Sequence, residues 1–283
     1  MSALEVLRGW GAPAAAGYLV GPPRAADAIV EGEVERLMPW ASVSKVVTAL
    51  AVWVAVEEGV TGWDHPGGPP GATLRHLLSH ASGLAPDDDR VLAAPARSRI
   101  YSNRGIEVAA QMVADGAGLP FEQYAAEAVL EPLGMTGTRL GHPSHGAHGP
   151  LSDLLRLAGE LLDPTLVDRA TWARATAVAF PGLSGVLPGF GRQPDNAWGL
   201  GVEIRDHKVP HWTGRRNSPA TFGHFGRSGS FLWVDPVAEV AAASLCDRPF
   251  GAWAAEAWPA ISDAVLAAAR PRPSVTAPRS EAP

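Results

Sequence analysis

The sequence is poor in cysteine, in lysine and in charge of either sign. Its 283 residues include a single cysteine, Cys246, which excludes a disulfide within the chain and any metal site built from several cysteines. Cys246 lies in an apolar, strand-like run, where we expect it to be buried as a small hydrophobic residue. The net charge of −6 provides no basic footprint, so we expect binding neither to nucleic acid nor to an anionic membrane.

Other signals are also missing. The longest apolar run, near residues 46–56, is too short to span a bilayer, and the N-terminus lacks the basic and apolar regions of a signal peptide. We therefore expect a cytoplasmic protein, and the preference for arginine over lysine is typical of a GC-rich bacterial genome. The chain contains no Gly-x-Ser-x-Gly motif, which argues against an α/β-hydrolase. It also contains no glycine-rich phosphate loop or dinucleotide fingerprint, so no organic cofactor is expected.

The apolar pattern predicts strands near both ends of the chain and helices between them. After a short opening helix we expect strands near residues 15–20 and 28–33, a buried helix at 46–56, helical segments within 73–180, strands near 198–204, 221–226, 230–234 and 240–246, and a helix at 251–269. This order predicts an α+β fold, an α/β sandwich in which an antiparallel sheet is flanked by N- and C-terminal helices and interrupted by a large all-helical insertion.

We expect one catalytic domain over residues 1–270, with the sheet part at about 1–64 and 196–270 and the insertion at about 65–195. Residues 271–283 are rich in proline and are predicted to form a disordered tail. An active site would lie in the crevice between the sheet and the insertion.

The chain has only two lysines, and one of them, Lys45, follows Ser42 by three residues at the start of the predicted buried helix. Positions i and i+3 lie on one face of a helix, so the hydroxyl and the amine would meet. Unlike arginine, a buried lysine can lose its proton and act as a base. The pair therefore predicts a serine nucleophile with a lysine base, whereas the alternative is an N-cap serine followed by a surface lysine.

Two further segments contain chemically useful residues. Tyr101 and Asn103 stand in a turn before a predicted helix; the phenol would relay a proton, and the asparagine would orient the lysine or bind a substrate carbonyl. The alternative is a tyrosine that packs on the core and an asparagine N-cap. His224 and Gly226 lie on a predicted inner strand, where a donor and a residue without a side chain would let substrate approach the strand edge, although a histidine on a strand is often structural.

Together and in this order, the segments at 42–45, 101–103 and 224–226 resemble the serine β-lactamase and penicillin-binding-protein superfamily, in its class C-like branch. The run Leu-Arg-His-Leu-Leu-Ser-His-Ala-Ser-Gly-Leu at 74–84, Glu-Pro-Leu-Gly-Met at 131–135 and Trp-Gly-Leu-Gly at 198–201 are similar to segments of the same family. The resemblance covers roughly residues 35–245.

The resemblance implies an acyl-enzyme mechanism. Ser42 would attack a carbonyl, Lys45 would take its proton, and Tyr101 would share that task or protonate the leaving group. The resemblance also implies that Asn103 positions Lys45 and the acyl group, and that the backbone amides of Ser42 and Arg227 form the oxyanion hole.

The family pattern is not matched everywhere. His224 occupies a position where class C β-lactamases carry a lysine, so the cation that grips a substrate carboxylate is missing. This difference favours an esterase acting on a small ester or amide over a β-lactamase or D,D-peptidase-type amidase. A catalytically silent member that serves as a binding module is the third interpretation.

Two other constellations have simpler explanations. His142, His145 and His148 recur in a loop rich in glycine and proline, but no carboxylate or cysteine accompanies them, so we expect no metal site. The three aspartates at 87–89 are interpreted as a solvated turn.

Overall fold

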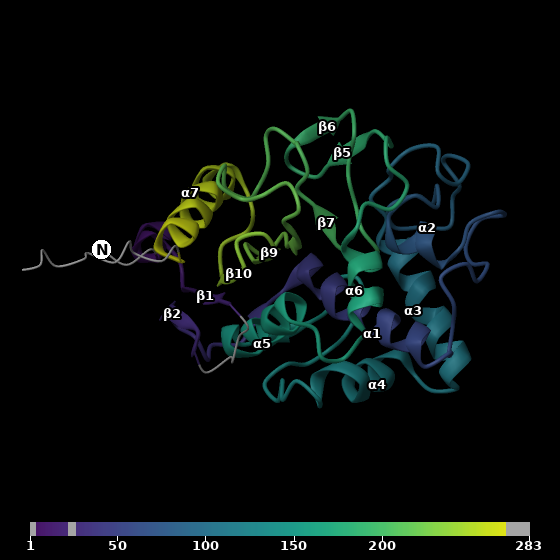
Figure 1. The fold of residues 1–283 in the computed structure, drawn as a ribbon, viewed down its shortest axis with the longest axis horizontal. Helices are drawn as coiled ribbons and strands as arrows, with labels where there is room; N and C mark the ends of the chain where they lie inside the picture. Colours follow the sequence, from purple (N-terminus) through teal and green to yellow (C-terminus); the bar gives the residue numbers. More distant parts are fainter. Residues whose placement is uncertain (1–3, 22–26, 270–283) are drawn as a thin grey trace, which may run out of the picture.

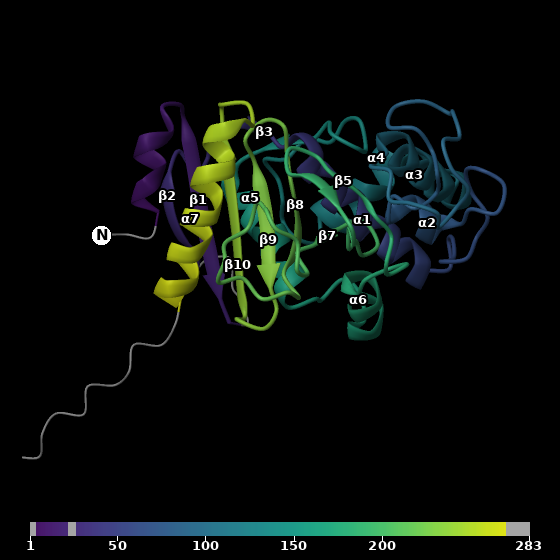
Figure 2. The same ribbon diagram turned by 90° about the horizontal axis from the view of Figure 1, so that it is seen from above.

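The computed structural model describes residues 4–21 and 27–269, so the tail predicted at 271–283 lies outside the described residues. Its centre is a six-stranded antiparallel sheet with the strand order β2-β1-β10-β9-β8-β7 (Figures 1 and 2). The strands are β1 (Ala14–Val20), β2 (Ile29–Gly32), β7 (Glu203–Ile204), β8 (Phe222–Phe225), β9 (Phe231–Asp235) and β10 (Val240–Cys246). The N-terminal strand β1 thus pairs with the C-terminal strand β10, with Ala14 opposite Cys246.

The remaining elements are mainly helical. They are η1 (Glu5–Trp10), β3 (Met38–Pro39), η3 (Ala41–Val43), α1 (Ser44–Glu57), α2 (Leu74–Leu78), α3 (Asn103–Ala117), α4 (Phe121–Ala125), the π-turn η4 (Ala126–Leu130), β4 (His148–Gly149), α5 (Leu151–Leu162), α6 (Arg169–Thr176), β5 (Gly185–Leu187), β6 (Gly191–Gln193) and α7 (Ala252–Ala269).

Helices cover both faces of the sheet, and each face has its own apolar cluster. Figure 2 shows α7 along one face, where Trp258 packs with Trp233 and the η1 residue Trp10. On the other face α5 packs against β1, β9 and β10, and its Leu155 belongs to the larger cluster that also contains α1. Cys246 is a buried free cysteine at the end of β10, as predicted. These layers confirm the predicted fold class.

Helix α1 lies between the sheet and the insertion and is buried on all sides. Every residue from Ser44 to Ala55 is buried, which is typical of a helix surrounded by other elements and not of a surface helix. It contacts α3, α4 and α6 of the insertion as well as β8 of the sheet. The indole N–H of Trp53 donates to the carbonyl of Leu200 at 2.8 Å. Lys45, which lies on the first turn of α1, is therefore located at the junction of the sheet and the insertion.

The insertion differs in detail from the all-helical segment that we expected. It contains α2 to α6, but also β4, which pairs with β3, and the hairpin of β5 and β6. The predicted strand at 198–204 is also shorter, because the chain turns back before β7: Gly201 has a φ of 96°, and the amide of Gly199 donates to the carbonyl of Val202 at 2.9 Å. Short hydrogen-bonded turns of this kind leave little trace in hydrophobic periodicity.

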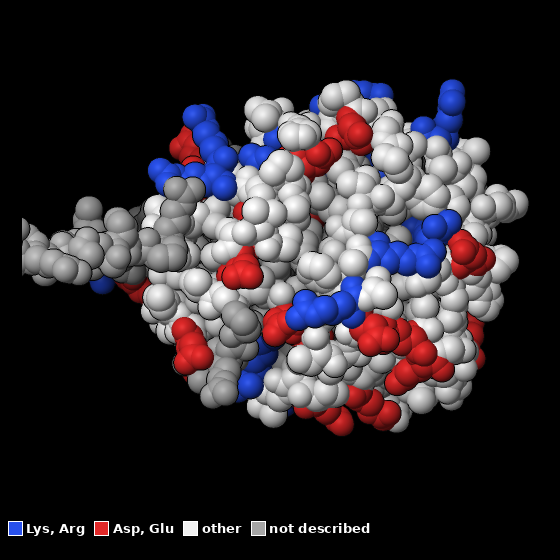
Figure 3. Space-filling view, viewed as in Figure 1, with Lys and Arg blue, Asp and Glu red and all other residues white. Residues whose placement is uncertain are grey.

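None of the helices within residues 4–21 and 27–269 is both long enough and apolar enough to cross a bilayer. Figure 3 shows acidic and basic side chains interspersed on the face that it displays, with apolar and neutral residues between them. The cytoplasmic location stays a prediction from the sequence.

Candidate active site

Ser42 lies on a tight bend between β3 and α1. The residue before it, Ala41, has a φ of 46°, a left-handed conformation that is unusual for a residue with a side chain. The bend is held from the sheet, because the Ser230 hydroxyl donates to the carbonyl of Trp40 at 2.7 Å. The Trp40 indole in turn donates to Gly149 at 3.2 Å. Such local strain persists only where the surrounding structure holds it in place, and it is often found at functional sites.

The predicted partner of Ser42 lies beside it. Lys45 has no exposed surface, and its Nζ donates to the Ser42 hydroxyl at 3.2 Å and to the carbonyl of Ser144 at 2.6 Å. Burial lowers the pKa of Lys45 from 10.5 to about 7, although the negative charges of Asp87 and Glu107 act in the opposite direction. A substantial fraction of the side chain is therefore a neutral amine near pH 7, as a general base must be.

Tyr101 completes the polar row next to Ser42. Its ring lies 4.9 Å from Nζ of Lys45, its hydroxyl is hydrogen-bonded at 3.4 Å to Nε2 of His224, and the Ser42 hydroxyl is near enough to act on its pKa. Burial raises the pKa of Tyr101. The side chain therefore stays a phenol, which suits it for relaying a proton and not for acting as a standing phenolate.

His224 is neutral, and its tautomer follows from its contacts. Nδ1 lies 2.7 Å from the carbonyl oxygen of Phe225, which accepts hydrogen bonds only, so Nδ1 is the protonated nitrogen. Nε2 is then the acceptor for the Tyr101 hydroxyl. Burial, together with the nearby charge of Lys45, lowers the pKa of His224 to about 3. His224 therefore brings no cation to the site near neutral pH.

Buried groups from the insertion position Tyr101. The guanidinium of Arg99 is buried and donates to the carbonyls of Ser79, Ala179, Phe180 and Asn196. Nδ1 of His80 accepts from the amide of Ser102 at 3.2 Å, and its ring lies 4.6 Å from that of Tyr101. The run at 74–84 that was singled out in the sequence thus shapes the tyrosine side of the site.

Gly226 brings the sheet close to the nucleophile. A Cβ at this position would clash with the Trp40 carbonyl oxygen and with the Ser230 hydroxyl, so a residue with a side chain would push the β8–β9 turn away from Ser42. The amide of Gly226 donates to Ser230 at 2.8 Å. Neither the Ser42 amide nor the Arg227 amide takes part in the turn and loop bonds between backbone groups of the described residues, so the predicted oxyanion-hole donors are not used there.

Asn103 is placed differently from what the sequence suggested. Its Nδ2 donates to Asp87 at 2.7 Å, and no hydrogen bond joins it to Lys45 within the described part of the chain. Position 103 opens α3, but the hydroxyl that caps this helix belongs to Ser102, which accepts from the amide of Gly105 at 2.9 Å.

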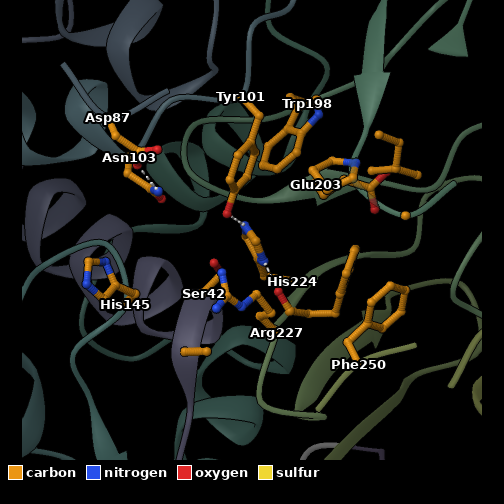
Figure 4. A pocket seen from close by; sticks show the side chains of 15 residues that line it. Ser42, Asp87, Tyr101, Asn103, His145, Trp198, Glu203, His224, Arg227 and Phe250 are labelled. Carbon is orange, nitrogen blue, oxygen red and sulfur yellow. Dashed lines mark hydrogen bonds between the residues drawn. The ribbon is translucent and has the colours of Figure 1, made fainter. Parts of the chain in front are cut away.

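A cavity of about 610 Å³ lies beside Ser42, Tyr101, Asn103 and His224 (Figure 4). Ser42 lies near its centre, with Tyr101 and Trp198 on one side and Arg227 and Phe250 on another. One arm is polar and contains Asp87, Asn103 and His145; the other is mostly apolar, and its lining includes Leu187, Pro188, Gly189, Trp198, Phe225 and Phe250.

Sequence reasoning missed several of these contributors. The sequence predicts a solvated turn at Asp87 and a loop without a metal site at His145, yet both residues line the cavity. The apolar arm of the cavity was not predicted, because its residues come from distant segments of the sequence. The Ser144 carbonyl that holds Lys45 carries no sequence signal, since every residue has a carbonyl. No group of three or more His, Cys, Asp or Glu side chains that could hold a metal ion occurs among the residues described here.

The second lysine has a separate role behind the cavity wall. Lys208 is buried and pairs with the buried carboxylate of Glu203, which also accepts from Nε2 of His211 and from the indole of Trp212. Burial alone would raise the pKa of Glu203, but His211 and Lys208 outweigh it and hold the carboxyl ionised. Glu203 thus anchors the start of β7, and its three donors leave it little capacity to take a further ligand.

Comparisons with known proteins agree with this geometry. The family model described as Beta-lactamase matches residues 33–266. A solved β-lactamase from Mycobacterium bovis is 52% identical, with a TM-score of 0.92 over 95% of this chain and 99% of that one. EstCE1, a hydrolase with promiscuous acyltransferase activity, is 18% identical and shares the fold with a TM-score of 0.73 over 93% of this chain and 96% of that one.

A curated relative, penicillin-binding protein 4* of Bacillus subtilis (strain 168), is 29% identical over 37% of this chain and 30% of its own length. The match thus spans less than a third of that protein. The family model and the Mycobacterium bovis structure each extend over most of this chain, and the residues matched by the family model include Ser42, Lys45 and Tyr101. The chain belongs to the β-lactamase family and has its serine hydrolase fold.

Proposed function

We propose that the protein hydrolyses small carboxylic esters through an acyl-enzyme on Ser42. The observation that supports this proposal best is the row of neighbouring polar groups from Lys45 through Ser42 and Tyr101 to a neutral His224. It provides a nucleophile and a phenol that relays a proton, both at the wall of one cavity, and a buried base with a pKa of about 7 next to the nucleophile.

The reaction proceeds in two balanced steps. In acylation, Ser42 Oγ bonds to the substrate carbonyl carbon while its proton passes to Nζ of Lys45. The negative charge on the carbonyl oxygen is held by the amides of Ser42 and Arg227. The bond to the leaving oxygen then breaks, and the proton reaches that oxygen from Lys45 through the Tyr101 hydroxyl. In deacylation, water donates a proton to the same base and attacks the acyl carbon. The bond from this carbon to Ser42 Oγ then breaks, the proton passes from Lys45 to Oγ, and the acid is released.

The absence of a positive charge at His224, where we place the leaving group, favours esters over β-lactams as substrates. His224 is buried and uncharged near neutral pH, so this strand offers no fixed cation to a substrate carboxylate. The apolar arm suits an uncharged acyl or alcohol group, because burying such a group needs no polar partner. EstCE1, which shares this fold, is a hydrolase with promiscuous acyltransferase activity.

A second candidate is a β-lactamase or D,D-peptidase-type amidase. Arg227 favours it, because its exposed side chain lines the cavity and forms no ion pair with the other described residues. A guanidinium in this position would grip a substrate carboxylate in place of the missing lysine. The β-lactamase from Mycobacterium bovis and the penicillin-binding protein of Bacillus subtilis are consistent with this reading.

Intact-protein mass spectrometry with a serine-directed fluorophosphonate tests the proposal, beside turnover of p-nitrophenyl acetate and nitrocefin. We expect one adduct, absent from Ser42→Ala, together with ester cleavage and negligible nitrocefin hydrolysis. Rapid nitrocefin hydrolysis that is lost in Arg227→Ala would favour the second candidate. Failure of the wild-type protein to form an adduct or turn over either substrate would favour a silent binding module and overturn the proposal.

A further inference from the structure

Asp87 differs from the two aspartates that follow it. Asp88 pairs with Arg90 at 2.9 Å, and Asp89 pairs with Arg104 at 2.6 Å. Asp87 forms no ion pair with any residue that the structure describes. Its carboxylate lines the cavity and accepts a hydrogen bond from Nδ2 of Asn103 at 2.7 Å (Figure 4).

This contact determines which way the Asn103 amide faces. A carboxylate only accepts hydrogen bonds, so it holds the NH₂ end of the amide and would repel the oxygen end. The Asn103 Oδ1 is therefore directed away from Asp87. This oxygen is buried and has no hydrogen-bond partner within the described residues. A buried acceptor without a donor is unfavourable, so it is poised to receive a donor that forms during the reaction.

The acylation step creates such a donor on Lys45. The neutral amine has two N–H groups, and the Ser42 proton gives the ammonium a third. The two acceptors now around Nζ are the Ser42 hydroxyl and the Ser144 carbonyl, so the ammonium has one N–H more than these contacts satisfy. Asn103 lines the same cavity as Ser42, and its oxygen is a buried acceptor without a donor among the described residues.

The negative charge of Asp87 favours the Lys45 ammonium, as does the orientation that Asp87 gives to the Asn103 amide. Asp87 is the foremost of the negative charges that raise the pKa of Lys45, and Glu107 is the second. Glu107 is itself paired with Arg104 at 3.2 Å and with His142 at 3.3 Å. The other titratable groups near Lys45 are the side chains of His80, His145, His224 and Tyr101. Burial favours the uncharged form of each of these four groups. Among the carboxylates that stabilise the Lys45 ammonium, Asp87 is therefore the one that has no cationic partner of its own within the described residues.

We propose that Asp87 is a positioning residue, which locks the Asn103 amide with its oxygen inward and stabilises the Lys45 ammonium formed during acylation. The inference rests on the proposed function, since it assumes that Lys45 is the base. Asp87 acts through Asn103 and Lys45 and does not touch the reacting atoms.

The pH profile of kcat/KM for p-nitrophenyl acetate tests this role between pH 5.5 and 8.5. The acidic limb should reflect Lys45, which is active when neutral. Asp87→Asn keeps an acceptor for Asn103 but removes the charge, so the Lys45 pKa falls and the limb moves to lower pH. The carboxylate is exposed and screened, so we expect a displacement of about 0.3–0.5 pH unit, or about two- to threefold more relative activity one unit below the wild-type midpoint.

Two further variants separate orientation from charge. Asp87→Ala should move the limb equally and also lower the plateau by about tenfold, because the Asn103 amide is then free to turn. Asp88→Asn is the matched control: it removes a neighbouring exposed carboxylate that is already paired with Arg90, and its limb should stay where the wild-type limb is. Thermal unfolding of each variant checks that the fold is retained.

The outcomes distinguish this inference from the proposed function. A wild-type acidic limb that Asp87→Asn leaves in place, or that Asp88→Asn moves as far, would overturn the role of Asp87 alone. A wild-type protein without ester turnover would overturn the proposed function, and this inference with it. A limb that moves only in the Asp87 variants, with a lowered plateau only in Asp87→Ala, is the result expected.

Discussion

Replacing Lys45 by methionine should stabilise the protein at neutral pH while abolishing its activity. The lysine is completely buried, and burial lowers the pKa of its ammonium from 10.5 to about 7. Methionine has a similar length and an adaptable shape, so it fills the same volume without a charge that must be desolvated. Burial of the Lys45 ammonium, which the catalytic site requires, is thus predicted to lower the free energy of unfolding.

The sign and size of the effect follow from the two pKa values. Below pH 7 the amine is protonated in both the folded and the unfolded chain, and the folded state bears the full cost of burying the charge. Above pH 7 the folded chain loses this proton first, so the cost declines until the unfolded chain also loses it near pH 10.5. The cost is about 4 kcal/mol at pH 7, and the two lost hydrogen bonds offset about 1 kcal/mol each. The net gain of Lys45→Met is therefore about 2 kcal/mol at pH 7.

Urea unfolding of the wild type and Lys45→Met between pH 7 and 9 measures this directly. The difference in unfolding free energy should change by about 2 kcal/mol over this range, in favour of the wild type as the pH rises. Groups that titrate alike in the two proteins cancel in the difference. A difference that stays constant from pH 7 to 9 would mean that the pKa of Lys45 is not lowered, and its role as a base would fall with it.

Three further substitutions test other parts of the site. Lys208→Met should have the opposite effect on stability, a loss of about 3–5 kcal/mol in urea unfolding, because it leaves the buried Glu203 carboxylate without its ammonium partner; an unchanged midpoint would contradict this ion pair. Gly226→Ala should lower the unfolding free energy by about 1–3 kcal/mol and impair acylation, because its Cβ clashes with the bend before Ser42; normal phosphonate labelling would show that the bend is less constrained than described. Tyr101→Phe keeps the ring beside Lys45 but removes the hydroxyl, so kcat should fall by about 10²–10⁴-fold with little change in thermal stability; turnover at the wild-type rate would exclude the phenol from proton transfer.

The local parts of the structure were predictable from the sequence. The all-apolar run after Lys45 indicated a buried helix, and the i, i+3 spacing placed the amine beside the Ser42 hydroxyl, where the structure has it at 3.2 Å. The order of strands and helices indicated the α+β fold, which is confirmed. Short-range features with a strong periodicity or a fixed helical spacing are readable because neighbouring residues determine them.

Features that depend on contacts between distant segments were not predictable in the same way. Asp87 appeared as one of three equivalent aspartates, and its distinct role follows only from its position beside Asn103. The Ser144 carbonyl reaches Lys45 across 99 residues of sequence. The apolar arm of the cavity is assembled from the β5–β6 hairpin, β8 and the segment before α7. In each case the relevant quantity is a distance in the folded molecule, which residue identity does not specify.

The sequence by itself determined which groups are available for the chemistry: a serine and a lysine on one helical turn, a tyrosine with an asparagine, and a histidine in place of a cation. Only the tertiary structure decided their states. The enclosed position of Lys45 brings its pKa to about 7, and the Phe225 carbonyl makes His224 a neutral acceptor for Tyr101. The physical reason is that protonation depends on burial and on neighbouring charges and dipoles, and these are properties of the packed fold.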